Sequence, residues 1–320
     1  MTFVYVEDAV RNHPRTLKVI EKLKPSQVIP IERYGEVFNR KSQHFRLQKL
    51  GPSFILAKKH GTHVYPTPPS FGIGAKNNYY FSHLLNCPFD CRYCFLQGMY
   101  RSASFVLFVN FEDFQNAILD KLSEEKATFF SGYDGDSLAM EPKTGFLSEF
   151  LPFFRNHPLA ELELRTKSIS IRELLTQESF PNCVVAFSLS PQPLIQELEK
   201  KTPPLSKRLE AIQKLQQAGW NIGLRFDPII DCENFHSHYT DFFQDVFKVI
   251  DDERLHSASL GSFRLPKPVM KEMKRLKPQD PLLALSQEDK RIQEKLLFCQ
   301  KELFKYIDRR KLFVCAEESL

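Results

Sequence analysis

Two kinds of apolar and polar patterning alternate along this chain. Runs with the apolar, aromatic and β-branched character of strands lie at 77–85, 127–133, 161–167, 184–190, 221–230 and 257–263. Between them lie amphipathic stretches with helical spacing, such as 111–125 and 205–219. The second stretch follows Pro203–Pro204 and ends at Gly219, which is the usual punctuation of a helix. Strands that alternate with helices predict a parallel sheet with right-handed crossovers, and the visible units predict a partial (β/α)6 barrel of the TIM-like kind.

The N-terminal part of the chain has a different pattern. We interpret residues 1–75 as an accessory region, with helical apolar spacing over 5–23 and short strands within 25–34 and 52–59. Residues 61–74 are rich in proline and glycine, which predicts an irregular linker.

The barrel and the C-terminal end follow this linker. Residues 76–285 contain the predicted barrel, and residues 286–320 form a C-terminal addition. This addition contains a predicted helix at 287–307 and a strand-like run at 311–317.

Composition limits the cellular setting. Apolar runs of about 18 residues, as a membrane-spanning helix requires, are missing, and the N-terminus lacks the features of a secretory signal. The seven cysteines are an odd number, and three lie within eight residues, so a secreted disulfide scaffold is not expected. We therefore expect a cytoplasmic protein without a membrane partner. The net charge of +5 is compatible with a phosphate-bearing partner.

The segment NCPFDCRYCFLQG (86–98) contains the clustered cysteines Cys87, Cys91 and Cys94 at the spacing C-x3-C-x2-C. They could be buried apolar residues, but three so close together favour a metal site. A structural zinc ion would need a fourth ligand, for which the candidates are His83, Cys183 and Cys232. An iron–sulfur cluster on three thiolates instead keeps one iron open for a reaction. The segment follows the first barrel strand, at the end where parallel barrels place their chemistry.

This spacing, with an aromatic residue before the third cysteine, resembles the signature of the radical S-adenosylmethionine (radical SAM) enzymes. The resemblance implies a 4Fe–4S cluster on Cys87, Cys91 and Cys94, with SAM bound to the open iron. It also implies reductive cleavage of SAM to a 5′-deoxyadenosyl radical, with an electron from a reducing partner such as flavodoxin or ferredoxin.

Further segments resemble the spore photoproduct lyase family of DNA repair enzymes. They are YCFLQG, ELRTKS, AFSLSPQPLIQELEKKTPPLSKRLEAIQKLQQAGWNIGLRFDPII and LGSFRLPKPVMKEMKR, and the similarity is strong over 80–277. The resemblance implies a radical SAM lyase that acts on a thymine dimer lesion in DNA.

The same resemblance implies contacts to SAM. Tyr93 matches the aromatic residue at the adenine side, Lys167 matches a lysine near the carboxylate, and Ser188 matches a serine that binds SAM. Asp227 falls near the adenosine position, where it could accept from a ribose hydroxyl or pair with Arg225. The turn SGYDGDSLAME (131–141) occupies the place of the motif that binds the SAM amine, and its acidic residues are Asp134 and Asp136.

The sequence departs from the family where a cysteine returns a hydrogen atom to the repaired thymine. Tyr133 stands at that position, and Phe95 replaces a second family tyrosine. We consider Tyr133 itself as the donor, or Cys232, which follows the fifth barrel strand. The alternative is a radical SAM enzyme with a different substrate, such as RNA, a peptide or a small molecule.

Basic residues near the end of the barrel are candidates for DNA contact. Lys267, Lys271 and Lys274 recur at helical spacing and, with Arg264, would suit backbone phosphates. The alternative is an ordinary solvated face. His236 and His238 fit a polar loop better than a substrate contact, and packing explains the remaining cysteines, Cys183, Cys299 and Cys315.

Overall fold

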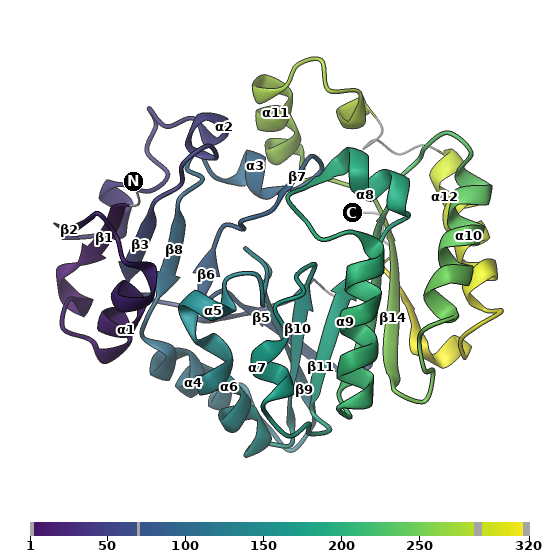
Figure 1. Cartoon of the computed structure of the whole chain (residues 1–320), viewed down its shortest axis with the longest axis horizontal. Coiled ribbons are helices and arrows are strands. Elements are labelled where there is room, and N and C mark those ends of the chain that lie inside the picture. Colours follow the sequence, from purple (N-terminus) through teal and green to yellow (C-terminus); the bar gives the residue numbers. More distant parts are fainter. Residues whose placement is uncertain (1–2, 69–70, 285–289, 316–320) are drawn as a thin grey trace.

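The structure is a computed structural model that describes residues 3–68, 71–284 and 290–315. Its main feature is a curled sheet of eight strands (Figure 1). In spatial order these are β15 (Leu312–Val314), β14 (Leu255–Ser262), β13 (Asn221–Ile229), β11 (Cys183–Ser188), β10 (Ala160–Thr166), β9 (Ala127–Ser131), β5 (Asn77–Phe81) and β4 (Val64–Pro66).

The six strands predicted from the sequence are the middle six of this sheet, and neighbours among them pair in parallel. The C-terminal strand prediction is also confirmed, because β15 pairs in parallel with β14. At the other edge, β4 pairs antiparallel with β5. The first predicted strand ends earlier than expected, at Phe81, because the chain then turns into a different sheet.

Helices cover the outer face of the curled sheet (Figure 1). They are α4 (Phe111–Leu119), α6 (Phe146–Arg155), α7 (Arg172–Leu175), α9 (Leu205–Gln217), α10 (Phe235–Phe247) and α12 (Lys290–Leu303). The predicted helices within 111–125, 205–219 and 287–307 correspond to α4, α9 and α12. Four further helices lie in the segments that follow β5, β9, β11 and β14 along the chain. They are α3 (Leu96–Met99), α5 (Glu141–Thr144), α8 (Gln192–Leu198) and α11 (Lys267–Leu276).

The two faces of the barrel strands differ in polarity. On β10, Leu162 and Leu164 are buried on one face, while Glu161, Glu163 and Arg165 alternate with them on the other. On β13, Phe226 packs against Phe242 of α10. The curled interior is therefore polar and charged, whereas the apolar face binds the helices.

A second sheet lies beside the barrel (Figure 1). Its order is β2 (Gln27–Ile31), β1 (Phe3–Glu7), β3 (Phe54–Ala57), β8 (Phe105–Phe108) and β6 (Leu84–Leu85). The strands predicted within 25–34 and 52–59 are confirmed as β2 and β3. Because β8 and β6 come from beyond residue 76, hydrogen bonds of this sheet cross the boundary predicted at residue 75. The division of the chain into an accessory region and a barrel stays a prediction.

The helix expected over 5–23 is wrong at its start. Residues up to Glu7 form β1, and α1 (Pro14–Leu23) begins only at Pro14, the first helical residue after the cap His13. The side chains of Val4 and Val6 are buried on one face of the strand. The buried Glu7 carboxylate accepts hydrogen bonds from the backbone N–H groups of Tyr34 and Lys58, at 2.7 and 2.9 Å. Long-range pairing with β2 and β3 therefore overrides the local helical spacing.

Two general properties follow from the described residues. Within 3–68, 71–284 and 290–315, no helix is long and apolar enough to cross a membrane. All seven cysteines carry free thiols.

Candidate active site

The cysteine segment lies at the carboxyl end of β5, between the two large sheets. After β6 the chain turns at Asn86, whose φ of 69° is left-handed, and reaches Cys87. The short strand β7 (Asp90–Cys91) then pairs antiparallel with β12 (Glu199–Lys200), so that Cys91 faces Glu199. This confirms the predicted position at the barrel mouth and ties the segment to the loop after α8.

The three thiols of this segment influence one another, and Cys91 is buried while Cys87 and Cys94 are half-buried. Burial raises the pKa of Cys87, of Cys91 and of Cys94, and the neighbouring thiols raise the pKa of Cys87 further. Cations act in the opposite direction, because Lys49 lowers the pKa of Cys87 and Lys167 lowers the pKa of Cys91. The segment therefore presents three thiols that influence one another, with the cations Lys49 and Lys167 beside them.

The arrangement does not support a single zinc ion. In the part of the chain that the structure describes, no three His, Cys, Asp or Glu side chains are gathered as one metal ion requires. The proposed fourth ligands are engaged elsewhere: His83 stacks on Phe146 at 3.8 Å, Cys183 begins β11, and Cys232 lies 3.9 Å from His238. A structural zinc site needs four ligands around one centre.

Glu199 organises a buried network beneath Cys91. Its carboxylate accepts a hydrogen bond from the Tyr93 hydroxyl, lies 2.5 Å from the Arg208 guanidinium and lies 3.9 Å from Lys167 Nζ. Burial alone would raise the pKa of Glu199, but Lys167 and Arg208 hold it below its usual range. Arg208 also donates to the backbone carbonyl of Ser188 at 2.9 Å. This network links Tyr93 and Lys167 through Glu199 and reaches the backbone of Ser188 through Arg208. The predicted contacts of these three residues to SAM stay predictions, and Glu199 and Arg208 were not predicted.

Lys167 is a buried cation rather than a solvated strand end. Its ammonium lies 5.6 Å from the centre of the Tyr93 ring, and only 17% of its side chain is exposed. Burial alone would lower the pKa of Lys167, but the Glu199 carboxylate and the Cys91 thiol raise it above the usual range. Lys167 therefore carries a fixed positive charge beside the cysteine segment.

A second buried lysine, which the sequence did not single out, lies on the other side of the segment. Lys49 follows α2 (Phe45–Gln48), and its ammonium donates to the carbonyl of Cys87. Burial lowers the pKa of Lys49, whereas Cys87, Asp90 and Cys94 raise it. Residues 45–49 are amphipathic in the sequence, but this pattern does not reveal that Lys49 contacts Cys87, because the contact exists only in the folded chain.

The predicted turn after β9 is held by glycine and aspartate. A Cβ at Gly132, where φ is 81°, would lie 2.6 Å from Ser137 Oγ. The Asp136 carboxylate accepts from the Thr166 hydroxyl and the Lys167 backbone N–H, both at 2.7 Å. Asp136 therefore positions the end of β10. Asp134 is buried, its pKa is raised by burial, and its Oδ1 lacks a hydrogen-bond partner among the described residues.

Tyr133 lies on this turn among other aromatic rings. It stacks on Tyr80 of β5 with 4.4 Å between ring centres, and its centre lies 5.7 Å from that of Phe95. Because Phe95 directly follows Cys94, the contact brings Tyr133 to the cysteine segment. The ring remains 42% exposed, so one side faces solvent at the mouth.

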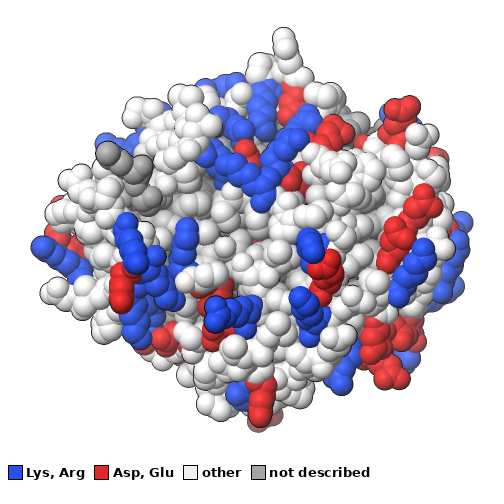
Figure 2. Space-filling view, viewed as in Figure 1, with Lys and Arg blue, Asp and Glu red and all other residues white. Residues whose placement is uncertain are grey.

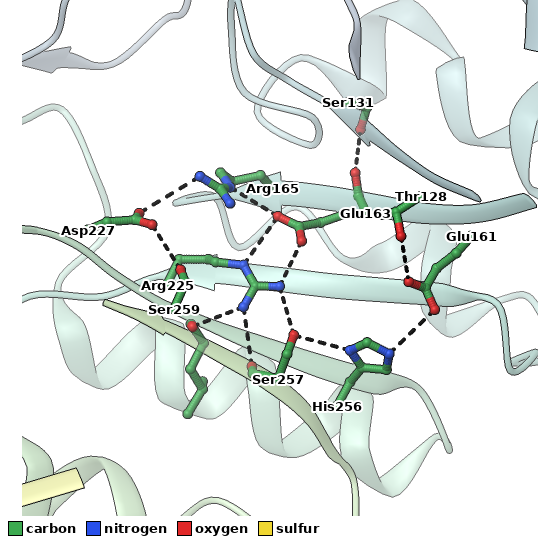
Figure 3. A network of polar contacts seen from close by, with 11 residues as sticks. Thr128, Ser131, Glu161, Glu163, Arg165, Arg225, Asp227, His256, Ser257 and Ser259 are labelled. Carbon is green, nitrogen blue, oxygen red and sulfur yellow. Dashed lines mark hydrogen bonds and ion pairs between the residues drawn. The ribbon is translucent and has the colours of Figure 1, made fainter. Parts of the chain in front are cut away.

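Asp227 belongs to a network that crosses the polar interior of the barrel (Figure 3). Its carboxylate accepts from the Ser259 hydroxyl at 2.8 Å and lies 3.8 Å from the Arg165 guanidinium. Of the two alternatives for Asp227, the pairing with Arg225 is not formed, because the Arg225 guanidinium turns to the Glu163 carboxylate at 2.7 Å. The contact with a ribose hydroxyl stays a prediction. A Cβ at Gly223 would lie 2.7 Å from Arg225 Nη2, so the glycine leaves room for this pair.

Comparison with known proteins adds to this geometry. A family model described as spore photoproduct lyase matches residues 76–312. The chain belongs to the spore photoproduct lyase family. A spore photoproduct lyase of Bacillus subtilis (strain 168) is 26% identical over 203 residues, which are 61% of this chain and 59% of that protein. A spore photoproduct lyase of Geobacillus sp. (strain Y412MC61) is 24% identical over 202 residues, which again are 61% of this chain and 59% of that protein. The matched region thus spans about three fifths of the length of these relatives.

Solved structures confirm the fold of this family member. A spore photoproduct lyase complexed with dinucleoside spore photoproduct superposes with a TM-score of 0.84 at 18% identity, covering 98% of both chains. A mutant with bound AdoMet and dinucleoside spore photoproduct gives a TM-score of 0.83 at 17% identity, also over 98% of both chains. The predicted fold class, a partial TIM-like barrel with additions at both ends, is therefore confirmed.

Other predicted residues of this spore photoproduct lyase family chain have surroundings that differ from those of the Glu199 network. Cys232 is half-buried after β13, where burial raises its pKa to about 11 and Asp231 and Lys295 are its charged neighbours. His236 packs against Phe298 of α12 at 4.5 Å. Cys183 and Cys299 are fully buried, as packing residues should be, and Cys315 is partly buried. A catalytic role for Cys232 stays a prediction.

The predicted basic stripe forms on α11 without Arg264. Lys267, Lys271 and Lys274 are exposed on α11, while Met270 and Met273 are buried beneath them. Arg264 precedes the helix, donates to the Cys315 carbonyl at 2.9 Å and lies over the Phe71 ring. Its contacts tie the C-terminal strand to the linker, so its contact with DNA stays a prediction, as does that of the stripe.

Proposed function

We propose that this protein is a radical SAM lyase that repairs a thymine dimer lesion of the spore photoproduct type in DNA. The observation that carries the proposal is that Cys87, Cys91 and Cys94 follow β5 in one short segment, near enough for the other two thiols to raise the pKa of Cys87, with the Lys167 ammonium beside Cys91. Family membership supports the same reaction, and solved relatives hold AdoMet and dinucleoside spore photoproduct.

The residues present fit a 4Fe–4S cluster. Three soft thiolates suit iron and leave one iron open, and the cations Lys49 and Lys167 offset their negative charge. Cys87, Cys91 and Cys94 would hold this cluster. When bound, the cluster and SAM supply one-electron cleavage of the sulfonium and a carbon-centred radical that takes a hydrogen atom from the substrate.

The chain's own groups would bind and orient SAM. Lys167, with its raised pKa, offers a cation to a carboxylate, and Tyr93 is fixed by its hydrogen bond to Glu199. The unpartnered Oδ1 of Asp134 offers an acceptor to an ammonium group. Ser188 and Asp227 remain candidates for contacts to SAM. Asp136 would act through Lys167, whose backbone it holds.

On the substrate side, Tyr133 is proposed as the hydrogen-atom donor. Its hydroxyl O–H bond would break as a new C–H bond forms on the thymine radical, which leaves a tyrosyl radical. The lysines Lys267, Lys271 and Lys274 would bind DNA phosphates without reading the sequence. The free thiols and the proposed cluster suit a reducing compartment, so we place the protein in the cytoplasm.

The deciding experiment uses reconstituted protein with dithionite and SAM, with or without a synthetic spore photoproduct dinucleotide. Chromatography follows both 5′-deoxyadenosine and restored thymidylyl-thymidine. We expect both products, and neither from Cys91→Ala. Deoxyadenosine without repair would overturn the lesion substrate and favour a different substrate of the same chemistry. SAM cleavage retained in Cys91→Ala would refute the cluster assignment.

A further inference from the structure

The surface over the cysteine segment contains two unusually exposed leucines. Leu50 is 87% exposed and Leu47 is 67% exposed, the highest values among the large apolar side chains of the described residues. They lie three positions apart on α2 and the turn that follows it, so they share one side of this short element. Exposed apolar side chains that lie together often mark a contact with another protein.

The inner side of the same element touches the cysteine segment. Phe45 and Lys49 line a small cavity together with Cys87 and Cys94. The Arg46 guanidinium forms a bidentate pair with Asp90 of β7, at 2.5 and 3.2 Å. A partner seated on Leu47 and Leu50 would therefore rest on the same element whose Phe45, Arg46 and Lys49 contact the cysteine segment.

The charge around the two leucines is positive. Lys201 lies near both Lys49 and Asp90, and Lys277 lies near Arg46. Two acidic residues lie among them: Asp90 is bound to Arg46 with a side chain 13% exposed, and Asp280, near Lys277, is bound to Arg92 with a side chain 8% exposed. Figure 2 shows lysine and arginine side chains gathered over α3, β7 and α11, beside the uncharged surface over α2.

We propose that Leu47, Leu50, Arg46, Lys201 and Lys277 form a docking face for a small acidic protein that carries one electron. This inference rests on the proposed function, because the cluster that the three cysteines would hold needs an external electron. In the step, one electron would leave the carrier, which would be oxidised, and reduce the cluster. No atom is transferred.

Two features favour a protein over nucleic acid as the occupant. An apolar centre with a charged rim is the usual anatomy of a protein interface, whereas a phosphate backbone gains nothing from exposed leucines. Opposite charge on the two partners accelerates their encounter, which suits a transient carrier that must leave after each transfer.

The test measures how fast the cluster is reduced. Reconstituted holoenzyme is mixed with flavodoxin hydroquinone in a stopped-flow instrument, and the loss of cluster absorbance is followed. We expect Leu47→Glu/Leu50→Glu to slow the second-order rate by about tenfold or more, and higher salt to slow the wild-type protein. Leu175→Glu, which replaces an exposed leucine of α7, is the matched control and should keep the wild-type rate.

Dithionite separates docking from the cluster itself, because this small reductant needs no docking face. Equal rates with dithionite and unequal rates with flavodoxin support the inference. Equal rates with both reductants overturn it. Weaker binding of a DNA duplex by the double variant, with an unchanged flavodoxin rate, overturns it in favour of nucleic acid. A protein that assembles no reducible cluster refutes the proposed function, and the inference falls with it.

Discussion

His83 lies fully inside the protein, with its ring stacked on Phe146 and edge-on to Phe111. Burial lowers its pKa from 6.5 to about 3. Below pH 6.5 the unfolded chain therefore takes up a proton that the folded chain refuses until about pH 3. Proton binding at His83 therefore favours the unfolded state below pH 6.5. The free energy of unfolding is unaffected by this group above pH 6.5 and falls progressively as the pH drops from 6.5 toward 3.

This predicts that His83→Met removes part of the acid sensitivity. From pH 7.5 to pH 5.5, the wild-type protein should lose about 1.3 kcal/mol more unfolding free energy than the variant, from the proton linkage of one histidine. Urea unfolding of both proteins at the two pH values measures this difference. Identical losses would mean that His83 accepts a proton inside the fold.

Tyr133 allows a second prediction at this scale. A phenylalanine ring cannot give up a hydroxyl hydrogen atom, so Tyr133→Phe should lower the yield of restored dinucleotide by about tenfold or more. Formation of 5′-deoxyadenosine should persist, because the thiols and Lys167 are untouched. Tyr80→Phe keeps the stacked ring and is the matched control. An unchanged repair yield in Tyr133→Phe would exclude the hydroxyl and return attention to Cys232.

Single residues differ in how far the sequence could identify them. The cysteines were found because their spacing is local. Lys167 was found only through a family resemblance. Glu199 and Lys49 were missed, since each acts on the cysteine segment from a distant part of the chain. A buried carboxylate or ammonium gains its role from partners that only the folded chain supplies.

Among the elements, β10 and β13 carry a fully buried ion pair, Glu163 with Arg225 (Figure 3). Arg225 also donates to the Ser257 hydroxyl of β14, so the pair links elements across the barrel interior. Burial alone would raise the pKa of Glu163, but Arg225 and Arg165 hold it below the usual range. Removal of Arg225 leaves the buried Glu163 carboxylate with one cation in place of two, the Arg165 guanidinium at 3.0 Å.

We therefore expect Arg225→Met to lower the free energy of unfolding by about 3–5 kcal/mol. The double variant Glu163→Met/Arg225→Met should lose less, because no unpaired charge remains between these two positions. Lys207→Met breaks an exposed pair with Glu210 and should change stability by about 0.5 kcal/mol or less. Chemical denaturation compares the three, and a double variant less stable than Arg225→Met would contradict the argument.

The sequence predicted the barrel strands and their helices because both patterns are local and repeated. It failed at β1, because the helical spacing expected over 5–23 includes Tyr5 to Glu7 of this strand. That strand exists because β2 and β3 supply its hydrogen-bond partners. No local pattern contains such partners, so pairing between distant segments decides between the two readings.

At the scale of the whole molecule, the accessory sheet and the barrel share one interior. A continuous cluster of buried apolar residues includes Val4 of β1, Val106 of β8 and Leu260 of β14. Lys49 and Arg46 add polar contacts from the accessory region to the cysteine segment. The accessory region is therefore expected to support the site as well as to cover it.

This view makes a prediction about truncation at residue 75. A chain of residues 76–320 keeps β8 and β6 but loses β3, which pairs with β8 along Phe54 to Ala57. The exposed edge and the apolar residues Val106 and Leu107 should then cause aggregation. Expression of 76–320 alone is expected to give insoluble protein, and coexpression with a 1–75 fragment should restore solubility by supplying β3 in trans. Size-exclusion chromatography and far-UV circular dichroism measure the outcome. A monomeric, folded 76–320 would instead show that the accessory region is a separable domain, because the barrel then holds β8 and β6 without it.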